Sequence, residues 1–187
     1  MTRIVFVRHG ESEANVADFI NDDPRRAVGL TARGIAQAEQ AAVALRHLDF
    51  GHAFASEFPR ARQTAALILG ARNCALGVDA RLNERRSGMD GLPTARFNDL
   101  VRPDPVNIRP PRGESFLEQM ARLRGFLDDI AATESAETIL AVSHENPILA
   151  VRALAGEDPE QAVRRGLPNC AWLVIERRLQ TWGLAEL

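Results

Sequence analysis

The sequence of 187 residues contains no lysine and no tyrosine, so all 23 of its basic residues are arginines. Arginine enrichment alone therefore carries no functional argument, and a binding site has to be inferred from where particular arginines fall. The formal net charge is only −2, which gives no overall field to attract nucleic acid or a membrane surface. We expect neither as a partner.

Cysteine is also scarce. Cys74 and Cys170 lie far apart without metal-ligand spacing, which predicts two reduced thiols that pack as small core residues. No stretch approaches the roughly 18 apolar residues of a membrane span, and the N-terminus lacks the pattern of a secretory signal. These absences predict a cytoplasmic protein. Hydrophobic residues make up 45% of the chain, which suits one domain over residues 1–187.

Apolar runs alternate with helical periodicity along the chain. The runs predict buried strands at residues 4–7, 53–56 and 138–142, with closing strands at 170–176 and 181–187. The periodicity predicts helices at residues 31–47, 60–69, 115–133 and 147–154. Thr31 is a plausible N-cap of the first helix, and Pro59 suits the first turn of the second. The order predicts an α/β fold: one three-layer α/β/α domain with a largely parallel central sheet.

Residues 85–113 interrupt this alternation. Glycine and proline recur throughout the segment and break regular structure repeatedly. We interpret it as a loop-rich excursion from the core that caps the active site, and not as a second domain.

Polar residues follow three of the predicted strands. Arg8 and His9 end the first, Arg60 comes soon after the second, and His144 follows the strand at 138–142. Because ligands bind beyond the carboxyl ends of parallel strands, we expect these side chains to converge. A neutral imidazole is a competent nucleophile, and guanidinium groups bind phosphate oxygens in a bidentate way. The set therefore favours phosphoryl transfer, while motifs of P-loop enzymes, serine hydrolases and zinc proteases are missing.

The sequence RHGES at residues 8–12 resembles the signature of the histidine phosphatase superfamily, which includes the cofactor-dependent phosphoglycerate mutases. Further matches follow in the family's order: Asn15, LTARG at 30–34, SEFPRARQTA at 56–65 and SH at 143–144, with weaker matches in PRGES at 111–115 and PNC at 168–170. The resemblance covers nearly the whole chain. It implies a phosphoglycerate mutase-like fold and a phosphohistidine intermediate.

The resemblance also implies roles for individual residues. His9 is the nucleophile that becomes phosphorylated, and Arg8, Arg60 and His144 complete the phosphate pocket. Asn15 falls where the family contacts the transferring phosphate. No metal is expected, because paired histidines and arginines would repel a divalent cation, and no cofactor is implied.

Glu84, within LNE, takes the acid/base position, where it would protonate the leaving oxygen and later activate water. Glu11, Glu57 and Asp90 are its rivals for this role.

Two segments depart from the family pattern. Most members carry glycine after the second histidine, whereas this chain has Glu145 followed by Asn146. We expect the Asn146 region to bind substrate, with a backbone amide facing the phosphate, and the Glu145 side chain to point away from the anion. The second departure is SGMDG at residues 87–91, where many relatives carry an aromatic-acidic pair.

Other polar residues are expected to have structural roles. His47 and His52 flank a helix end and suit solvated or capping positions. Five further arginines are interpreted as surface charge, with contact to a substrate as the alternative: Arg25, Arg26, Arg85, Arg86 and Arg112.

Three functions compete. The first is a phosphomonoester hydrolase that acts on a small phosphorylated metabolite. The second is a phosphoglycerate mutase, which is disfavoured by the short chain, and the third is a non-catalytic scaffold that binds a phosphorylated ligand. The physiological ester and the oligomeric state stay open.

Overall fold

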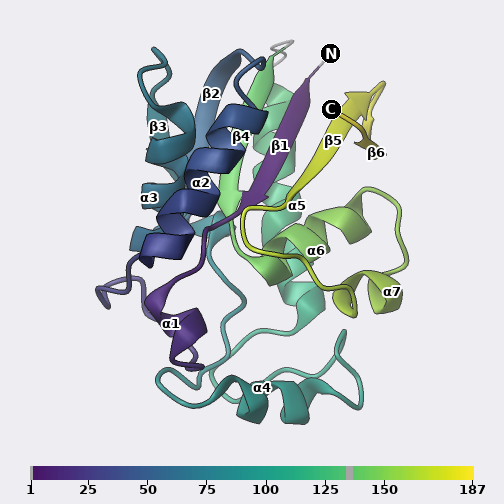
Figure 1. Ribbon diagram of the computed structural model, residues 1–187. Coiled ribbons are helices and arrows are strands. Elements are labelled where there is room, and N and C mark those ends of the chain that lie inside the picture. The colour runs from purple at the N-terminus through teal and green to yellow at the C-terminus, as the bar shows by residue number, and fades with distance from the viewer. Residues whose placement is uncertain (1, 134–136) are drawn as a thin grey trace.

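The computed structural model describes residues 2–133 and 137–187. Within them a six-stranded sheet has the order β3-β2-β4-β1-β5-β6 (Figure 1). The strands are β1 (Arg3–Arg8), β2 (Phe50–Ala55), β3 (Leu76–Val78), β4 (Thr138–Ser143), β5 (Trp172–Arg178) and β6 (Thr181–Ala185). The first four run parallel, and β5 and β6 add antiparallel strands at one edge. The predicted, largely parallel sheet is confirmed, and β3 is an edge strand that the sequence analysis missed.

Helices cover both faces of the sheet. They are α1 (Glu13–Val16), α2 (Ala32–Ala44), α3 (Pro59–Leu69), α4 (Thr94–Val101), α5 (Phe116–Ala132), α6 (Glu145–Leu154) and α7 (Pro159–Val163), with a short 3-10 helix at Ala80–Leu82. One hydrophobic core lies between the sheet and α2 and α3, and the other between the sheet and α5 and α6. In Figure 1, α2 crosses the near face and α5 lies behind. The three-layer α/β/α prediction is confirmed.

Strand β1 explains why its sequence is apolar at every position. Ile4 and Phe6 pack into the core beneath α5 and α6, whereas Val5 and Val7 pack beneath α2 and α3. Since successive side chains of a strand point to opposite faces, a strand covered on both sides needs apolar residues throughout.

The helix starts follow local chemistry. The Thr31 side chain accepts a hydrogen bond from the Gly34 amide and caps α2, and Pro59 is the first residue of α3, as predicted. Helix α6 begins at Glu145, two residues before the predicted start. Proline is tolerated within a first helical turn, because its missing N–H would have no partner there. Pro147 therefore does not mark the helix start.

Residues 85–113 leave the sheet and return to it as a segment that includes α4. This helix was missed by the sequence analysis. It lies beyond the end of the sheet at which β1 finishes (Figure 1). Arg85 is only 3% exposed and donates to the backbone carbonyls of Pro105, Ile108 and Glu114. The interpretation of Arg85 as surface charge is therefore wrong: its guanidinium satisfies carbonyls that the broken backbone of this segment leaves without helix or sheet partners.

Both cysteines are free thiols. Cys170 is buried against the α2 and α3 core, and Cys74 is partly buried beside the same core. Of the helices in the described ranges, none has the length and apolar character needed to cross a bilayer.

Candidate active site

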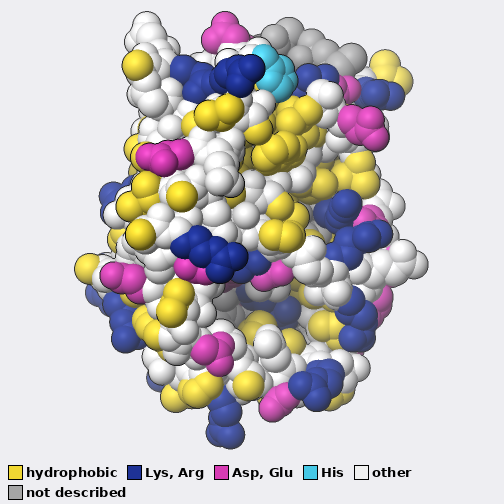
Figure 2. Space-filling view, in the orientation of Figure 1, with side chains coloured by type: hydrophobic (Ala, Val, Ile, Leu, Met, Phe, Trp, Pro, Cys, Tyr) yellow, Lys and Arg dark blue, Asp and Glu magenta, His cyan; other side chains and the backbone are white. Residues whose placement is uncertain are grey.

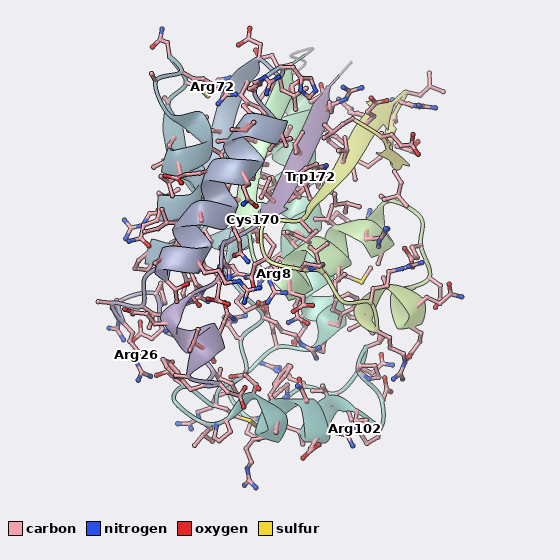
Figure 3. All side chains as sticks on the ribbon, in the orientation of Figure 1. Arg8, Arg26, Arg72, Arg102, Cys170 and Trp172 are labelled. Atoms are coloured by element: carbon pink, nitrogen blue, oxygen red, sulfur yellow. The ribbon has the colours of Figure 1, made fainter. Side chains whose placement is uncertain are left out.

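A cavity of about 470 Å³ opens where the strands end at their carboxyl edge. Figure 2 shows the surface hollowed between the main body and the segment around α4, with basic and acidic side chains near the rim. Figure 3 places Arg8 below the end of β1, on the side that faces this segment. The predicted site residues in the wall are Arg8, His9, Asn15, Arg60, Glu84 and Asn146. His144 stands behind the wall and is fully buried, with its ring centroid 5.0 Å from that of His9.

His9 is buried and presents one ring nitrogen to the cavity side. Its Nδ1 lies 2.7 Å from the Gly10 carbonyl oxygen, which can only accept, so Nδ1 carries the proton. The Nε2 atom is left as an acceptor and receives the Arg60 Nε–H at 3.1 Å. Burial and the nearby Arg60 charge hold the pKa of His9 well below its usual range. The imidazole is therefore neutral at Nε2, as a nucleophile requires.

The loop that carries His9 is fixed by close backbone packing. A Cβ on Gly10 would lie 2.4 Å from the Gly34 carbonyl oxygen, and a Cβ on Gly34 would lie 2.0 Å from the Glu11 carbonyl oxygen. The Gly10 amide also donates to Thr64 Oγ1 at 3.0 Å. The two glycines in RHGES and LTARG thus let this loop rest directly on the start of α2.

Arg60 joins the two histidines. It is 4% exposed and is the second residue of α3. Besides the bond to His9, its Nη2 lies 3.2 Å from His144 Nδ1, and its Nη1 donates to the Asn21 side chain. Burial lowers the pKa of Arg60 to about 10, which leaves it charged at neutral pH. Asn21 was missed by the sequence analysis, because it sits in an irregular segment with no motif around it.

His144 is held in the opposite tautomer. Since its Nδ1 accepts from Arg60, its Nε2 carries the proton and donates to Ser56 Oγ at 2.8 Å. Burial and the Arg60 charge hold the pKa of His144 well below its usual range. Both histidines are therefore neutral, and the positive charge beside them comes from Arg60 and Arg8.

Protein groups in the described part of the chain engage the Arg8 guanidinium only in part. Its Nη1 lies 3.0 Å from Glu145 Oε2 and also donates to the Leu167 carbonyl. Its Nε is buried and has no partner in the described part of the chain. A buried N–H without an acceptor costs roughly 1–3 kcal/mol. An anionic oxygen in the cavity would satisfy it.

Glu84 is the acidic side chain best placed for proton transfer. It lines the cavity, and its Oε1 accepts from the Arg85 amide at 2.7 Å. Burial is the main cause that raises the pKa of Glu84, and Glu145 adds to the rise. A carboxyl group with a raised pKa holds its proton closer to neutral pH, as a general acid must.

The three other acidic residues considered for the acid/base role lie outside the cavity wall, and each accepts a hydrogen bond there. Glu11 accepts from Thr31 Oγ1, Glu57 accepts from the Asn83 side chain, and Asp90 accepts from the Asp22 amide.

The two asparagines occupy helix starts. Asn15 Oδ1 accepts from the Ser12 amide and hydroxyl, each at 3.0 Å, in a capping box at α1. Asn146 is the second residue of α6. Both border the cavity, but the Asn15 oxygen is already engaged.

Glu145 does not point away from the cavity, and that expectation is wrong. It lines the wall, its Oε2 pairs with Arg8, and its Oε1 accepts from the Leu167 amide at 3.0 Å. The Arg8 charge compensates the carboxylate and lets it stay in the site.

The remaining histidines lie away from the cavity. His47 is exposed, and His52 Nε2 lies 3.4 Å from Glu137 Oε2, near the start of β4. Among residues 2–133 and 137–187, no group of three or more His, Cys, Asp or Glu side chains is placed to hold a metal ion.

The chain matches the histidine phosphatase superfamily (branch 1) over residues 4–187. It is 33% identical over 153 residues to the adenosylcobalamin/alpha-ribazole phosphatase of Salmonella typhimurium, covering 76% of this chain and 74% of that protein. It is 30% identical over 191 residues to the probable phosphoglycerate mutase GpmB of Erwinia tasmaniensis, covering 97% of this chain and 88% of that protein.

Solved structures of other proteins share the fold of this chain over nearly its whole length. A putative alpha-ribazole-5'-P phosphatase from Escherichia coli superimposes with a TM-score of 0.81 at 27% identity, covering 100% of this chain and 95% of the other. A mycobacterial glucosyl-3-phosphoglycerate phosphatase gives a TM-score of 0.85 at 24% identity, covering 99% and 98%, and supports the fold alone. The chain belongs to the histidine phosphatase superfamily. The family and its relatives named as phosphatases confirm the prediction of a phosphohydrolase.

Proposed function

We propose that this chain hydrolyses small phosphomonoesters through a phosphohistidine on His9, without a metal ion. One observation carries the proposal. The Nε2 atom of a neutral His9 carries no proton and accepts from the Arg60 guanidinium, in the same cavity wall as Arg8, whose buried Nε has no partner in the described chain.

In the first step, His9 Nε2 attacks the phosphorus atom and the bond to the ester oxygen breaks. Arg60 and Arg8 hold the non-bridging oxygens, on which negative charge is spread in the transition state. The Glu84 carboxyl gives its proton to the leaving oxygen, so the product departs as an alcohol.

In the second step, the Glu84 carboxylate takes a proton from water, and the resulting hydroxide attacks the phosphorus. The bond between phosphorus and Nε2 breaks, which frees inorganic phosphate and restores neutral His9. The Nδ1–H bond to the Gly10 carbonyl keeps the ring in one orientation through both steps.

Three further residues complete the proposed phosphate pocket. His144 acts from behind by holding Arg60 Nη2. Asn146 lies in the first turn of α6, where backbone amides and the helix dipole favour an anion. Asn15 borders the same space and contacts the transferring phosphate.

Residues 85–113 are proposed to cap this site. Ser87, Thr94, Phe97 and Val101 from this segment line the cavity opposite the phosphate-binding residues. The segment therefore lies where the leaving group of an ester would extend. A cytoplasmic location is proposed with it, because two free cysteines suit a reducing compartment.

A phosphoglycerate mutase is the second candidate. It is favoured by the 30% identity to the Erwinia tasmaniensis protein, which extends over nearly the whole chain. The 33% identity to an alpha-ribazole phosphatase supports hydrolysis, with a small phosphorylated metabolite as substrate.

The test is phosphate release from a panel of esters, including 3-phosphoglycerate, in the presence of EDTA. Wild type is expected to release phosphate and His9→Ala to release none above background. Loss of activity in EDTA with rescue by added metal would contradict the metal-free mechanism. Interconversion of 2- and 3-phosphoglycerate without phosphate release would instead establish the mutase.

A further inference from the structure

Glu145 places a fixed carboxylate in the wall of a cavity proposed to bind anions. One of its oxygens pairs with Arg8 and the other accepts from the Leu167 amide, so the group is held at two points. Its side chain is 31% exposed and lines the cavity. The carboxylate is therefore held in one position at the site and is not a mobile surface group.

Each cation of the wall already has at least one protein acceptor. In the described chain, Arg8 binds Glu145, Arg60 binds Asn21 and both histidines, Arg85 binds three backbone carbonyls, and Arg165 binds Glu157. The unpartnered Arg8 Nε suits the phosphate itself. A second anionic group on a substrate would therefore lie near the Glu145 carboxylate and would have to compete with these protein acceptors for a guanidinium.

The rest of the wall combines polar side chains, among them Asp22, Thr94 and Asn98, with an apolar portion. The apolar portion is formed by side chains from the segment after α1 and from α4, α6 and α7, namely Phe19, Ile20, Phe97, Val101, Leu149 and Val163. Apolar walls gain free energy by covering apolar ligand surface and lose it by desolvating a charge.

We propose that this site selects phosphomonoesters whose leaving group is uncharged and partly apolar, and that Glu145 is the specificity-determining residue that rejects a second anionic group. The inference rests on the proposed hydrolytic function and adds the substrate class. It also separates this chain from an enzyme built for a carboxylated ester such as phosphoglycerate.

A second consequence concerns Glu84. Glu145 helps to raise the pKa of Glu84, whereas Arg60 and Arg8 lower it. The backbone amide of Arg85 binds its carboxylate, and Arg122 from α5 donates to its backbone carbonyl. Removing the Glu145 charge alone therefore lowers the pKa of Glu84. Glu84 then loses its proton at a lower pH and stops acting as a general acid there.

The experiment compares kcat/KM for phenyl phosphate and 4-carboxyphenyl phosphate, which share a phenolate leaving group and differ in one carboxylate. Wild type is expected to favour phenyl phosphate roughly tenfold or more, as two like charges in a partly desolvated site imply. In Glu145→Gln the ratio of the two kcat/KM values is expected to fall toward one. The basic limb of the pH profile of kcat/KM for phenyl phosphate is expected to move to lower pH. Glu160→Gln, an exposed change of equal charge on α7, is the control and leaves the preference unchanged.

The outcomes separate the two proposals. Hydrolysis of neither ester would overturn the proposed function. Hydrolysis of both at similar kcat/KM by wild type, or a preference that persists in Glu145→Gln, would overturn the role of Glu145 and leave the hydrolytic function intact. If Glu145→Gln unfolds, Glu145→Gly, the residue of most relatives, gives the same test.

Discussion

At the residue scale, burial and the Arg60 charge together keep both histidines neutral. Arg60 bonds His9 Nε2 and His144 Nδ1 from one guanidinium, and its charge opposes a proton on either ring. Burial acts in the same direction, because it disfavours the charged imidazolium. The proposed nucleophile, His9, is thus kept neutral by its own surroundings, without a separate base.

Replacing Arg60 with Gln is expected to raise the pKa of His9 and of His144 toward the ordinary value, because the Coulombic cause is removed while burial remains. Imidazole resonances followed by NMR through a pH titration measure this directly. In wild type both rings should stay neutral to a pH well below 6.5. Unchanged midpoints in Arg60→Gln would show that the charge of Arg60 does not control them.

Glu84 supplies the second prediction. Glu84→Gln keeps the size of the side chain and removes its proton. The variant should slow phenyl phosphate by about 10²–10⁴-fold, whereas p-nitrophenyl phosphate, whose leaving group scarcely needs a proton, should be affected much less. Steady-state kcat/KM for the two esters is the measurement, because it reports the first step and not the hydrolysis of the intermediate that both esters share. Glu57→Gln is the control outside the cavity. Equal losses on both esters would show that Glu84 is not the acid.

At the element scale, the loop after β1 owes its position to two glycines pressed together. A Cβ on Gly34 would meet the backbone of Glu11 at 2.0 Å, a contact that no side-chain rotation relieves. Since this loop carries His9, the packing of α2 is coupled to the geometry of the site.

Gly34→Ala is therefore expected to lower the free energy of unfolding by roughly 1–3 kcal/mol, the usual cost of overpacking. This cost should exceed the gain of about 1 kcal/mol that alanine brings to a helix. Denaturant unfolding measures the change. Gly183→Ala, where the added Cβ would have no atom within 4 Å, should alter stability by no more than about 0.5 kcal/mol. Equal stability of both variants would contradict the packing argument.

At the scale of the whole molecule, the elements and site residues that could be predicted from sequence are those with a local sequence pattern. The layers could be predicted from the all-apolar run of β1 and from helix signals such as the Thr31 cap. The convergence of His9, Arg60 and His144 could be predicted from the polar residues that follow β1, β2 and β4. Each pattern reports which faces of an element are covered or how an element starts.

The features that sequence could not supply depend on contacts distant in the chain. Asn21 reaches Arg60 from an irregular segment, and Arg85 binds carbonyls up to 29 residues away. Glu145, at the start of α6, stays in the cavity because Arg8, at the end of β1, pairs with it. None of these partners is marked by spacing or periodicity, so each becomes visible only when the chain is folded.

The mechanism proposed for the molecule depends on one covalent step, and trapping the phosphorylated intermediate tests the proposal most directly. Wild type mixed with p-nitrophenyl phosphate and quenched in alkali, where phosphohistidine survives, should show by mass spectrometry one added phosphoryl group that maps to His9. The Glu84→Gln variant should carry more of it, because Glu84 is also the base for hydrolysis of the intermediate, and His9→Ala should carry none. Turnover by wild type with no phosphorylated protein, or a phosphoryl group on another residue, would contradict the account.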